Sequence, residues 1–473
     1  MEMNIYMKKL SKWNGYYLVT YILMLMAPLT GLVSDIAFAN ILLPFILIME
    51  SRCGYVVLLM AGYWVTECLP LPMTALMPIV LFPCLNILSI KDTCECYMND
   101  LVMYFIGSQI LAIAIEHSKL HLRVALKIMQ VFGYTHKRLL AGTILATTFL
   151  SMWITSATAT AMMVPIVLTI LSELERVDIG KVFHNLRNPE DANSGPIPTK
   201  VTMAYLLGMA YAATFGGTAT LFGTATNLVF KGIFEQVFLC APKIGFDQWM
   251  LYSAPLAYAN AFITWLYLIV MYFGEVEPNG HYASIDTIGS EGANTVKRVL
   301  KEKYDDLGKV TTHEVGVAIT YITVVVLLLT RKPGFATGWV DIIPGRKIPE
   351  SAPMILVLLL MFLIPRDLNF LNICSTDENK IPKAPSKSLI AWKLVETKIP
   401  WGLMFLLGAG VAMSQAIKKS GLAETLEKSM TPVQSLSAFD VLVIVCIIVG
   451  TITEVTPEIA RANIMLPVVA SMY

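Results

Sequence analysis

Ten blocks of apolar residues, separated by shorter polar stretches, dominate the chain. They run at about 16–49, 54–88, 101–116, 138–171, 201–235, 249–274, 313–330, 351–365, 401–417 and 437–470. A helix of roughly 20 apolar residues is long enough to cross the hydrocarbon core of a bilayer. Only 15% of the 473 residues are charged, against about 25% in ordinary soluble domains. The sequence therefore predicts an all-α polytopic membrane protein.

The charged residues exclude some functions and indicate a topology. The net charge is +1, so no basic field would attract nucleic acid. Lys8, Lys9 and Lys12 precede the first apolar block, which favours a cytoplasmic N-terminus. The segment 118–138 mixes basic and apolar residues. It suits a helix lying at the cytoplasmic interface, although a solvated loop is the alternative.

The chain shows no pattern of a membrane enzyme or of a metal centre. Its six histidines are dispersed, and neither His-Glu-x-x-His nor Gly-x-Ser-x-Gly occurs. Cys94 and Cys96 form an isolated Cys-x-Cys without a second pair. We therefore expect neither catalysis nor a bound metal cofactor.

Two segments that lie 302 residues apart resemble each other. Residues 151–165 and 453–467 each have a polar, small-residue centre between apolar arms, and both continue as Met-(Val/Leu)-Pro-(Ile/Val)-Val. The same offset relates Ser118-Lys-Leu120 to Ser420-Gly-Leu422. Paired repeats with apolar segments interrupted at corresponding positions are typical of secondary transporters.

Polar residues interrupt three apolar blocks, which is costly in lipid unless the freed backbone lines a cavity within the protein. The first interruption is Thr-Ser-Ala-Thr-Ala-Thr at 155–160, and the second, at 216–227, contains two Gly-Thr pairs. Hydroxyls and free carbonyls there suit a small cation, and helix N-termini meeting there suit an anion. Back-bonded hydroxyls within ordinary helices, or small residues that allow tight helix packing, remain alternatives.

The third interruption, at 453–461, carries ionisable side chains between two apolar arms. Glu454, Glu458 and Arg461 are functional candidates because charge inside a membrane segment is expensive. A structural alternative is that Glu458 and Arg461, three residues apart, neutralise each other on a helix. Glu67, just before a Pro-Leu-Pro stretch, is a further candidate that would otherwise stabilise a broken helix end.

Motifs spread over almost the whole chain resemble those of the divalent anion–sodium symporters, solute carrier family 13. The resemblance is above all to its insect branch, the "I'm not dead yet" citrate transporters. The motifs include Tyr63-Trp-Val-Thr-Glu-Cys-Leu-Pro-Leu-Pro72, Thr160-Ala-Met-Met163, Gly223-Thr-Ala-Thr-Asn-Leu228, Lys309-Val-Thr-Thr-His-Glu314 and Ala462-Asn-Ile464.

This resemblance implies an inverted-repeat, elevator-type transporter with two re-entrant hairpins and two unwound helices. It implies a homodimer, surrounded by lipid in the plasma membrane, that carries citrate, succinate and other di- and tricarboxylates. Transport would be coupled to sodium or occur by exchange. No cofactor is expected besides Na⁺ as a coupling ion.

The resemblance also assigns site residues. At the tip of the first hairpin, the family's Ser-Asn-Thr positions correspond to Thr155, Ser156 and Ala157, which would bind substrate together with Thr224. In the second hairpin the corresponding positions are Pro457, Glu458 and Ile459. The residues expected to bind sodium are Ser151, Thr155, Ser156, Gly223 and Thr453.

Both hairpins depart from the family pattern. Ser156 keeps a hydroxyl but lacks the amide that donates to a carboxylate, and Pro457 lacks a backbone donor. Glu458 would repel an anion unless it is protonated or paired with Arg461. Hydroxyls and helix N-termini, rather than a fixed arginine, are therefore expected to hold the substrate.

Resemblance and repeat together divide the chain into four parts. Scaffold helices and the interfacial helix would occupy 1–137, the first hairpin and unwound helix 138–235, further scaffold helices 236–400, and the second-repeat helix and hairpin 401–473. A partner of Gly223 is expected 302 residues later (223 plus 302, position 525), so the last part of the second repeat is expected to be missing.

Two alternatives to transport by this chain follow from these departures. One is a non-transporting homologue that modulates a full-length transporter. The other is a proton-coupled variant in which Glu458 replaces a lost sodium site.

Overall fold

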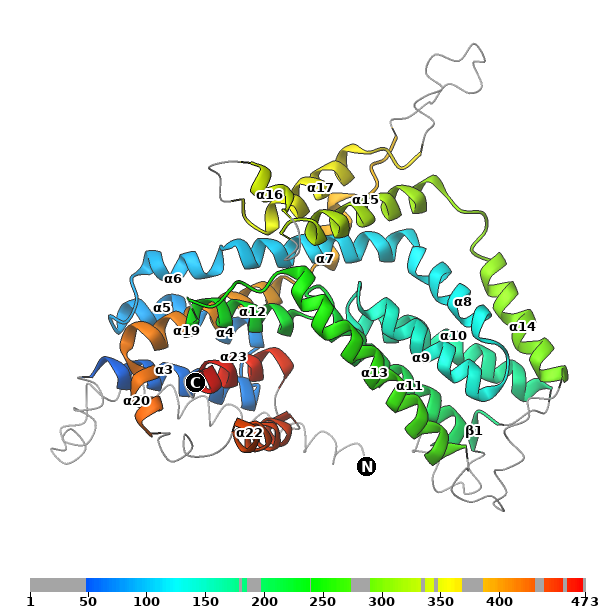
Figure 1. Ribbon diagram of the computed structural model, residues 1–473, viewed down its shortest axis with the longest axis horizontal. Helices are drawn as coiled ribbons and strands as arrows, with labels where there is room; N and C mark the ends of the chain where they lie inside the picture. The colour runs from blue at the N-terminus through cyan, green and yellow to red at the C-terminus, as the bar shows by residue number, and fades with distance from the viewer. Residues whose placement is uncertain are drawn as a thin grey trace, which may run out of the picture. The chain divides into compact units, whose positions relative to one another are not determined.

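The computed structural model describes residues 48–177, 181–184, 197–238, 240–273, 290–332, 337–343, 348–367, 386–429, 438–453 and 457–470. Nearly all elements in these ranges are helices (Figure 1), as the predicted all-α class requires. A short antiparallel pair, β1 (Phe183–His184) and β2 (Ile197–Pro198), aligns Phe183 with Pro198. The N-terminal lysines, almost all of the first apolar block and Glu454 lie outside the described residues.

The chain forms two compact units. One contains the described residues of 1–103, 228–243 and 400–473, and the other contains those of 104–227 and 244–399. We refer to them as the first and the second unit. The four parts predicted from the sequence were defined by their roles in transport, whereas the two units are defined by internal packing. The four-part division therefore stays a prediction.

Long helices packed against one another form the centre of the second unit (Figure 1). They are α9 (His136–Ser151), α10 (Ser156–Arg176), α11 (Lys200–Ala219) and α13 (Phe246–Tyr272). The same unit also contains α8 (Leu120–Phe132), α14 (Ser290–Asp305), α15 (Thr312–Leu329), α16 (Trp339–Ile342), α17 (Ser351–Leu363) and α18 (Trp392–Lys398).

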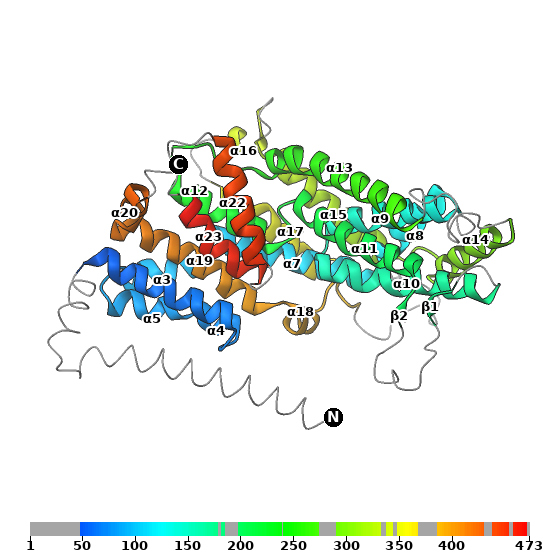
Figure 2. The same ribbon diagram turned by 90° about the horizontal axis from the view of Figure 1, so that it is seen from below.

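The first unit packs around α19 (Trp401–Ser420). Three α19 glycines allow close approach: a Cβ would lie 2.4 Å from the Pro72 side chain at Gly402, 2.4 Å from Tyr97 at Gly408 and 2.1 Å from Asn463 at Gly410. The surrounding helices are α3 (Met49–Thr66), α4 (Leu71–Ala75), α5 (Met77–Cys84), α6 (Ile90–Tyr97), α20 (Leu422–Ser429), α22 (Ala438–Thr453) and α23 (Glu458–Ala470). Figure 2 shows α23 beside α19.

Two helices join the units, α7 (Asp100–Ser118) and α12 (Ala225–Val237). The apolar block at 54–88 belongs to three helices, α3, α4 and α5. Prolines explain the boundaries between them, because Pro72 and Pro78 occupy the first turns of α4 and α5. Glu67 lies at the end of α3 in a left-handed conformation with a φ of 50°, and its side chain is exposed.

The repeat predicted from the sequence recurs in the helix boundaries. Six helices begin near residues 49, 90, 100, 120, 136 and 156, and six others begin 302 residues later, to within one residue, at 351, 392, 401, 422, 438 and 458. The matched pairs are α3 with α17, α6 with α18, α7 with α19, α8 with α20, α9 with α22, and α10 with α23. The two halves of the repeat therefore have the same local structure.

Five helical segments of the described chain are long and apolar enough to cross a membrane. They are Ile90–Ser118, Ser156–Arg176, Phe246–Tyr272, Thr312–Leu329 and Trp401–Ser420. Shorter apolar helices occur at Leu71–Cys84, Ser351–Leu363 and Phe439–Thr451. These segments fit a multi-pass membrane protein.

The basic segment after α7 is a helix, α8, rather than a solvated loop. Its polar face is smaller than the sequence suggested, because His121 and Arg123 are buried while Lys127 is exposed. Burial lowers the pKa of His121, whose Nδ1 lies 3.0 Å from the carbonyl of Ile115. Arg123 is buried because it finds an acidic partner far along the chain, described below.

Candidate functional site

The first predicted interruption is a tight turn between two helices. α9 ends at Ser151 and α10 begins at Ser156. Thr155 is the N-cap of α10, and its Oγ1 accepts a hydrogen bond from the backbone N–H of Thr158 at 3.4 Å. The break thus lies at 152–155, slightly before the predicted 155–160, and Thr160 back-bonds to the Ser156 carbonyl within α10.

The second interruption separates α11 from α12. α11 ends at Ala219, Thr220 is extended, and α12 begins at Ala225. The Asn227 side-chain amide donates to the carbonyls of Gly217 at 2.9 Å and Thr220 at 2.7 Å. Because these carbonyls belong to the end of α11 and lack helical partners, Asn227 stabilises the unwound segment.

The two interruptions lie against each other in the second unit. The hydroxyl of Thr220 donates to the carbonyl of Met152, in the turn after α9, at 2.5 Å. A Cβ added to Gly223 would lie 2.4 Å from the carbonyl oxygen of Gly217, and one added to Gly216 would lie 2.2 Å from that of Thr148. The sequence has glycine here because the backbones touch, so any side chain would force them apart.

Three oxygens surround the space beside the Cα of Gly217. From the position that a Gly217 Cβ would occupy, Ser156 Oγ lies at 2.5 Å, the Gly223 carbonyl at 3.6 Å and Ser151 Oγ at 3.7 Å. Ser151 is fully buried, and its Oγ also lies 2.5 Å from the Ala213 carbonyl and 3.1 Å from Ser156 Oγ. We call this arrangement the oxygen cluster.

The chemistry of this place suits ions of either sign. Hydroxyl and carbonyl oxygens are the ligands that hard cations prefer. The N-termini of α10 and α12 carry partial positive charge that favours an anion. Thr155, Ser156 and Thr224 are half-buried, and Ala157 is exposed. Among the described residues no group of three or more His, Cys, Asp or Glu side chains is placed to hold a metal ion.

The second hairpin has the same helix boundaries but different side chains. α22 ends at Thr453 and α23 begins at Glu458, while 454–456 are outside the described residues. Glu458 is exposed and Ile459 is half-buried. The pairing of Glu458 with Arg461, one of the two alternatives, is not found among the described residues. Nη1 of Arg461 is covered and has no hydrogen-bond partner there.

The structure therefore divides the predicted site residues. It brings Ser151, Thr155, Ser156, Ala157, Gly223 and Thr224 into one region of the second unit, while Thr453, Pro457, Glu458 and Ile459 belong to the first unit. Sequence reasoning did not identify Gly217, Thr220 and Asn227 individually, although all three fall within the Gly-Thr interruption.

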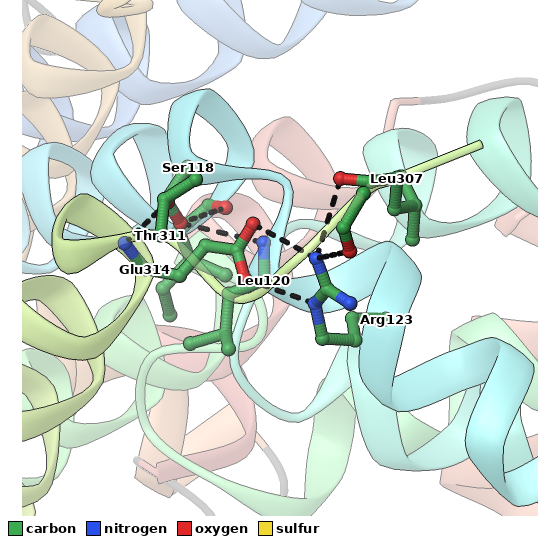
Figure 3. A network of polar contacts seen from close by, with 8 residues as sticks. Ser118, Leu120, Arg123, Leu307, Thr311 and Glu314 are labelled. Carbon is green, nitrogen blue, oxygen red and sulfur yellow. Dashed lines mark hydrogen bonds and ion pairs between the residues drawn. The ribbon is translucent and has the colours of Figure 1, made fainter. Parts of the chain in front are cut away.

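A buried ion pair holds the helix that leads to the first hairpin (Figure 3). Arg123 on α8 binds Glu314 on α15 through both ends of its guanidinium, with Nε–Oε2 at 2.9 Å and Nη2–Oε1 at 3.2 Å. Nη2 also donates to the carbonyls of Leu307 and Gly308 at 3.4 and 3.1 Å. These contacts join α8 to the linker between α14 and α15.

The same network is supported from both sides. Thr311 caps α15 by accepting from the Glu314 N–H at 3.2 Å, and the guanidinium lies 5.2 Å from the centre of the Tyr304 ring. The hydrogen bonds to Glu314 raise the pKa of Arg123, which keeps the guanidinium charged. The sequence did not indicate it, because the partners are 191 residues apart.

These features define a class. Apolar helices long enough to span a bilayer, a structural repeat and two interrupted helices held against each other are the features of a secondary transporter. The cluster of oxygens at the contact of the interruptions is the kind of ion site that such proteins form.

Comparison with known proteins identifies the family. Residues 55–473 match the citrate transporter family model, CitMHS. The chain is 40% identical to the protein I'm not dead yet of Drosophila melanogaster, over 89% of this chain and 73% of that protein. It is 34% identical to the Na(+)/citrate cotransporter of Rattus norvegicus, over 91% of this chain and 81% of the relative. It is 30% identical to the Na(+)/dicarboxylate cotransporter 3 of Homo sapiens, over 89% and 77%.

The chain belongs to the citrate transporter family. This confirms the resemblance inferred from its motifs. It also confirms that the chain belongs to a family of multi-pass membrane transporters.

Proposed function

We propose that this chain carries citrate, succinate and other di- and tricarboxylates across the plasma membrane, by sodium coupling or by exchange. The observation that supports it most directly is the oxygen cluster at Gly217, where two helix interruptions meet. Relatives named as Na(+)/citrate and Na(+)/dicarboxylate cotransporters support the substrate class and the ion. The proposed activity is transport, not an enzymatic reaction.

Sodium would bind at the oxygen cluster. Ser151 Oγ, Ser156 Oγ and the Gly223 carbonyl already point toward one space, and Thr155 is the N-cap beside them. In the second hairpin, Thr453 would supply the corresponding oxygen. A bound cation would also neutralise the repulsion between the anion and the surrounding carbonyls.

The anion would bind next to the cation. Thr155, Ser156 and Thr224 offer hydroxyl donors, and Ala157 lies exposed in the first turn of α10, where backbone N–H groups are free of helical partners. The motif resemblance assigns Pro457, Glu458 and Ile459 of the second hairpin to the substrate as well. The absence of an amide at Ser156 and of a backbone donor at Pro457 would weaken recognition relative to a Ser-Asn-Thr motif.

The movement would be of the elevator type. Both helix–turn–helix segments, 136–176 and 438–470, would enter the membrane as re-entrant hairpins and move with their bound ions. The unwound helix within 138–235 and the second-repeat helix within 401–473 would move with them. The helices of 1–137 and 236–400 would form a scaffold, with a homodimer as the working unit and the N-terminus in the cytoplasm. Arg123 and Glu314 would keep α8 attached to that scaffold while α9 moves.

Uptake into proteoliposomes tests the proposal. The purified 473-residue chain is reconstituted, and labelled citrate or succinate is offered with an inward sodium gradient, with choline in place of sodium, and with unlabelled dicarboxylate inside the vesicles. We expect uptake above empty liposomes, with Gly223→Ala as the inactive control. Uptake by reconstituted protein that equals uptake by empty liposomes in all three conditions would reject transport by this chain.

A further inference from the structure

One guanidinium nitrogen in the second hairpin is covered and lacks a hydrogen-bond partner among the described residues. Arg461 is in the first turns of α23, inside an otherwise apolar helix, and is half-buried. Its Nη1 nitrogen is covered and makes no hydrogen bond within the described residues. The carboxylate one turn before it, Glu458, is exposed, and no ion pair joins the two within the described residues.

Several physical effects disfavour a charge at this position. A buried charged donor without a partner loses its hydration without compensation. A cation near the N-terminus of a helix opposes the helix dipole. The position that corresponds in the first repeat, 302 residues earlier, is Ala159, which is fully buried. The fold therefore accommodates a small apolar residue here and does not require an arginine.

The remaining explanation is a ligand of opposite charge. A guanidinium fork matches a carboxylate, to which it donates two parallel hydrogen bonds. Carboxylate anions are what this family's members are named for. The segment 457–459, immediately before Arg461 in α23, is also the one that the motif resemblance assigns to substrate.

We propose that Arg461 is a fixed cationic anchor for one carboxylate of the transported anion. This inference rests on the proposed function and revises the expectation that only hydroxyls and helix N-termini hold the substrate. Arg461 supplies at the second hairpin the positive charge that a cation supplies at the first. Anion binding accordingly keeps a component that does not depend on sodium.

Thermal unfolding in detergent with and without citrate, in sodium-free buffer, tests the anchor by binding alone. Wild-type protein is compared with Arg461→Gln, with Arg461→Lys, and with Arg176→Gln, an exposed arginine on α10. We expect citrate to raise the Tm of wild type and of Arg176→Gln. Arg461→Gln should lose most of this shift, and Arg461→Lys, which keeps the charge but not the fork, should show an intermediate shift.

The citrate-free Tm separates a binding role from a structural one. A partly buried arginine without a bound anion destabilises the folded protein. Arg461→Gln without citrate should therefore unfold at the same temperature as wild type or at a higher one. A lower citrate-free Tm would identify Arg461 as a structural residue and overturn the proposal. An undiminished citrate shift in Arg461→Gln would overturn it as well.

Uptake distinguishes this inference from the proposed function. In proteoliposomes, Arg461→Gln should raise the KM for succinate roughly tenfold, as expected for loss of a charged hydrogen-bonding partner. If wild type transports and the KM is unchanged, the anchor is wrong and transport stands. If wild type binds citrate through Arg461 but does not transport it, the anchor stands and transport is wrong. A wild type that neither binds nor transports overturns both.

Discussion

Single glycines determine whether the oxygen cluster can form. Gly217 and Gly223 bring two stretches of backbone into direct contact, and the carbonyl and hydroxyl oxygens converge because no side chain separates them. The two Gly-Thr pairs in the sequence predicted the interruption. They did not predict that Asn227 would cap the end of α11, because that role depends on the path of the unwound chain.

Gly223→Ala should abolish uptake and lower the Tm. The new Cβ would meet the Gly217 carbonyl at 2.4 Å, a distance that backbone atoms cannot tolerate, so the interruptions must separate. We expect a destabilisation of about 1–3 kcal/mol, typical of overpacking, measured by thermal unfolding alongside labelled-citrate uptake.

Gly62→Ala is the matched control for this change. Gly62 lies in α3 with no atom within 4 Å of its added Cβ, so alanine should stabilise the helix by about 0.5–1 kcal/mol. Normal uptake by Gly223→Ala would show that the contact does not matter for function.

At the scale of elements, the repeat extends to individual hydrogen bonds. Ser118 Oγ donates to the Ile115 carbonyl at 2.9 Å and accepts from the Leu120 N–H at 3.4 Å. Ser420 makes the same two contacts with Ile417 and Leu422, at 3.2 and 3.4 Å. The residue between helices is left-handed in both copies, Lys119 with a φ of 61° and Gly421 with a φ of 80°.

Lys119→Gly should therefore stabilise the protein. The left-handed conformation costs an L-residue with a side chain roughly 1–2 kcal/mol, which glycine avoids, although glycine loses more entropy on folding. We expect a net gain of about 0.5–1 kcal/mol in thermal unfolding. The reverse change, Gly421→Ala, should lose a similar amount, since its Cβ would meet only ordinary contacts beyond 3.4 Å. Equal stability of both variants and wild type would contradict the strain argument.

A second prediction concerns the pair that joins α8 to α15. Arg123→Met or Glu314→Leu alone should each cost about 3–5 kcal/mol, because each leaves a buried charge without its partner. The double variant should recover much of this loss. A double-mutant cycle by thermal unfolding measures the coupling, and strictly additive losses would argue against a direct interaction.

Much of the element level could be predicted from the sequence, and part of it could not. The offset of 302, seen in a few residues around Pro165 and Pro467, correctly predicted matching helix–turn–helix segments. The burial of His121 and Arg123 was missed because the acidic partner of Arg123 lies on α15, far along the chain. Of the two interpretations left open for Glu458 and Arg461, mutual pairing is not found among the described residues, because spacing on a helix permits a contact without enforcing it.

At the scale of the whole molecule, the exposed apolar side chains of α13 indicate that this helix faces lipid. This helix of 27 residues leaves Leu251, Phe262, Ile263 and Tyr267 exposed, as expected of a segment that faces lipid. Composition alone indicated the membrane class, but the side of each helix that faces outward had to come from the packing of α9, α11 and α13.

Ile263→Lys should reduce the amount of protein inserted in membranes. A lysine in the middle of an apolar span costs about 2.5–3.5 kcal/mol in membrane insertion, and the Ile263 side chain is largely exposed. Asn260→Lys, about one turn earlier and at a position that is already polar and half-buried, gives the comparison. Carbonate extraction of membranes checks both, and full recovery of Ile263→Lys in the membrane fraction would place this face away from lipid.

The contact between Gly217 and Gly223 sets limits on how such a protein can diversify. Polar side chains around it can be exchanged, as Ser156 at the family's Asn position indicates, and new substrate preferences can arise in that way without disturbing the framework. The two glycines themselves cannot be exchanged in this way, since any larger residue would push the two stretches of backbone apart. Substitutions that change which substrate is carried should therefore occur at the residues beside this contact and not at the two glycines.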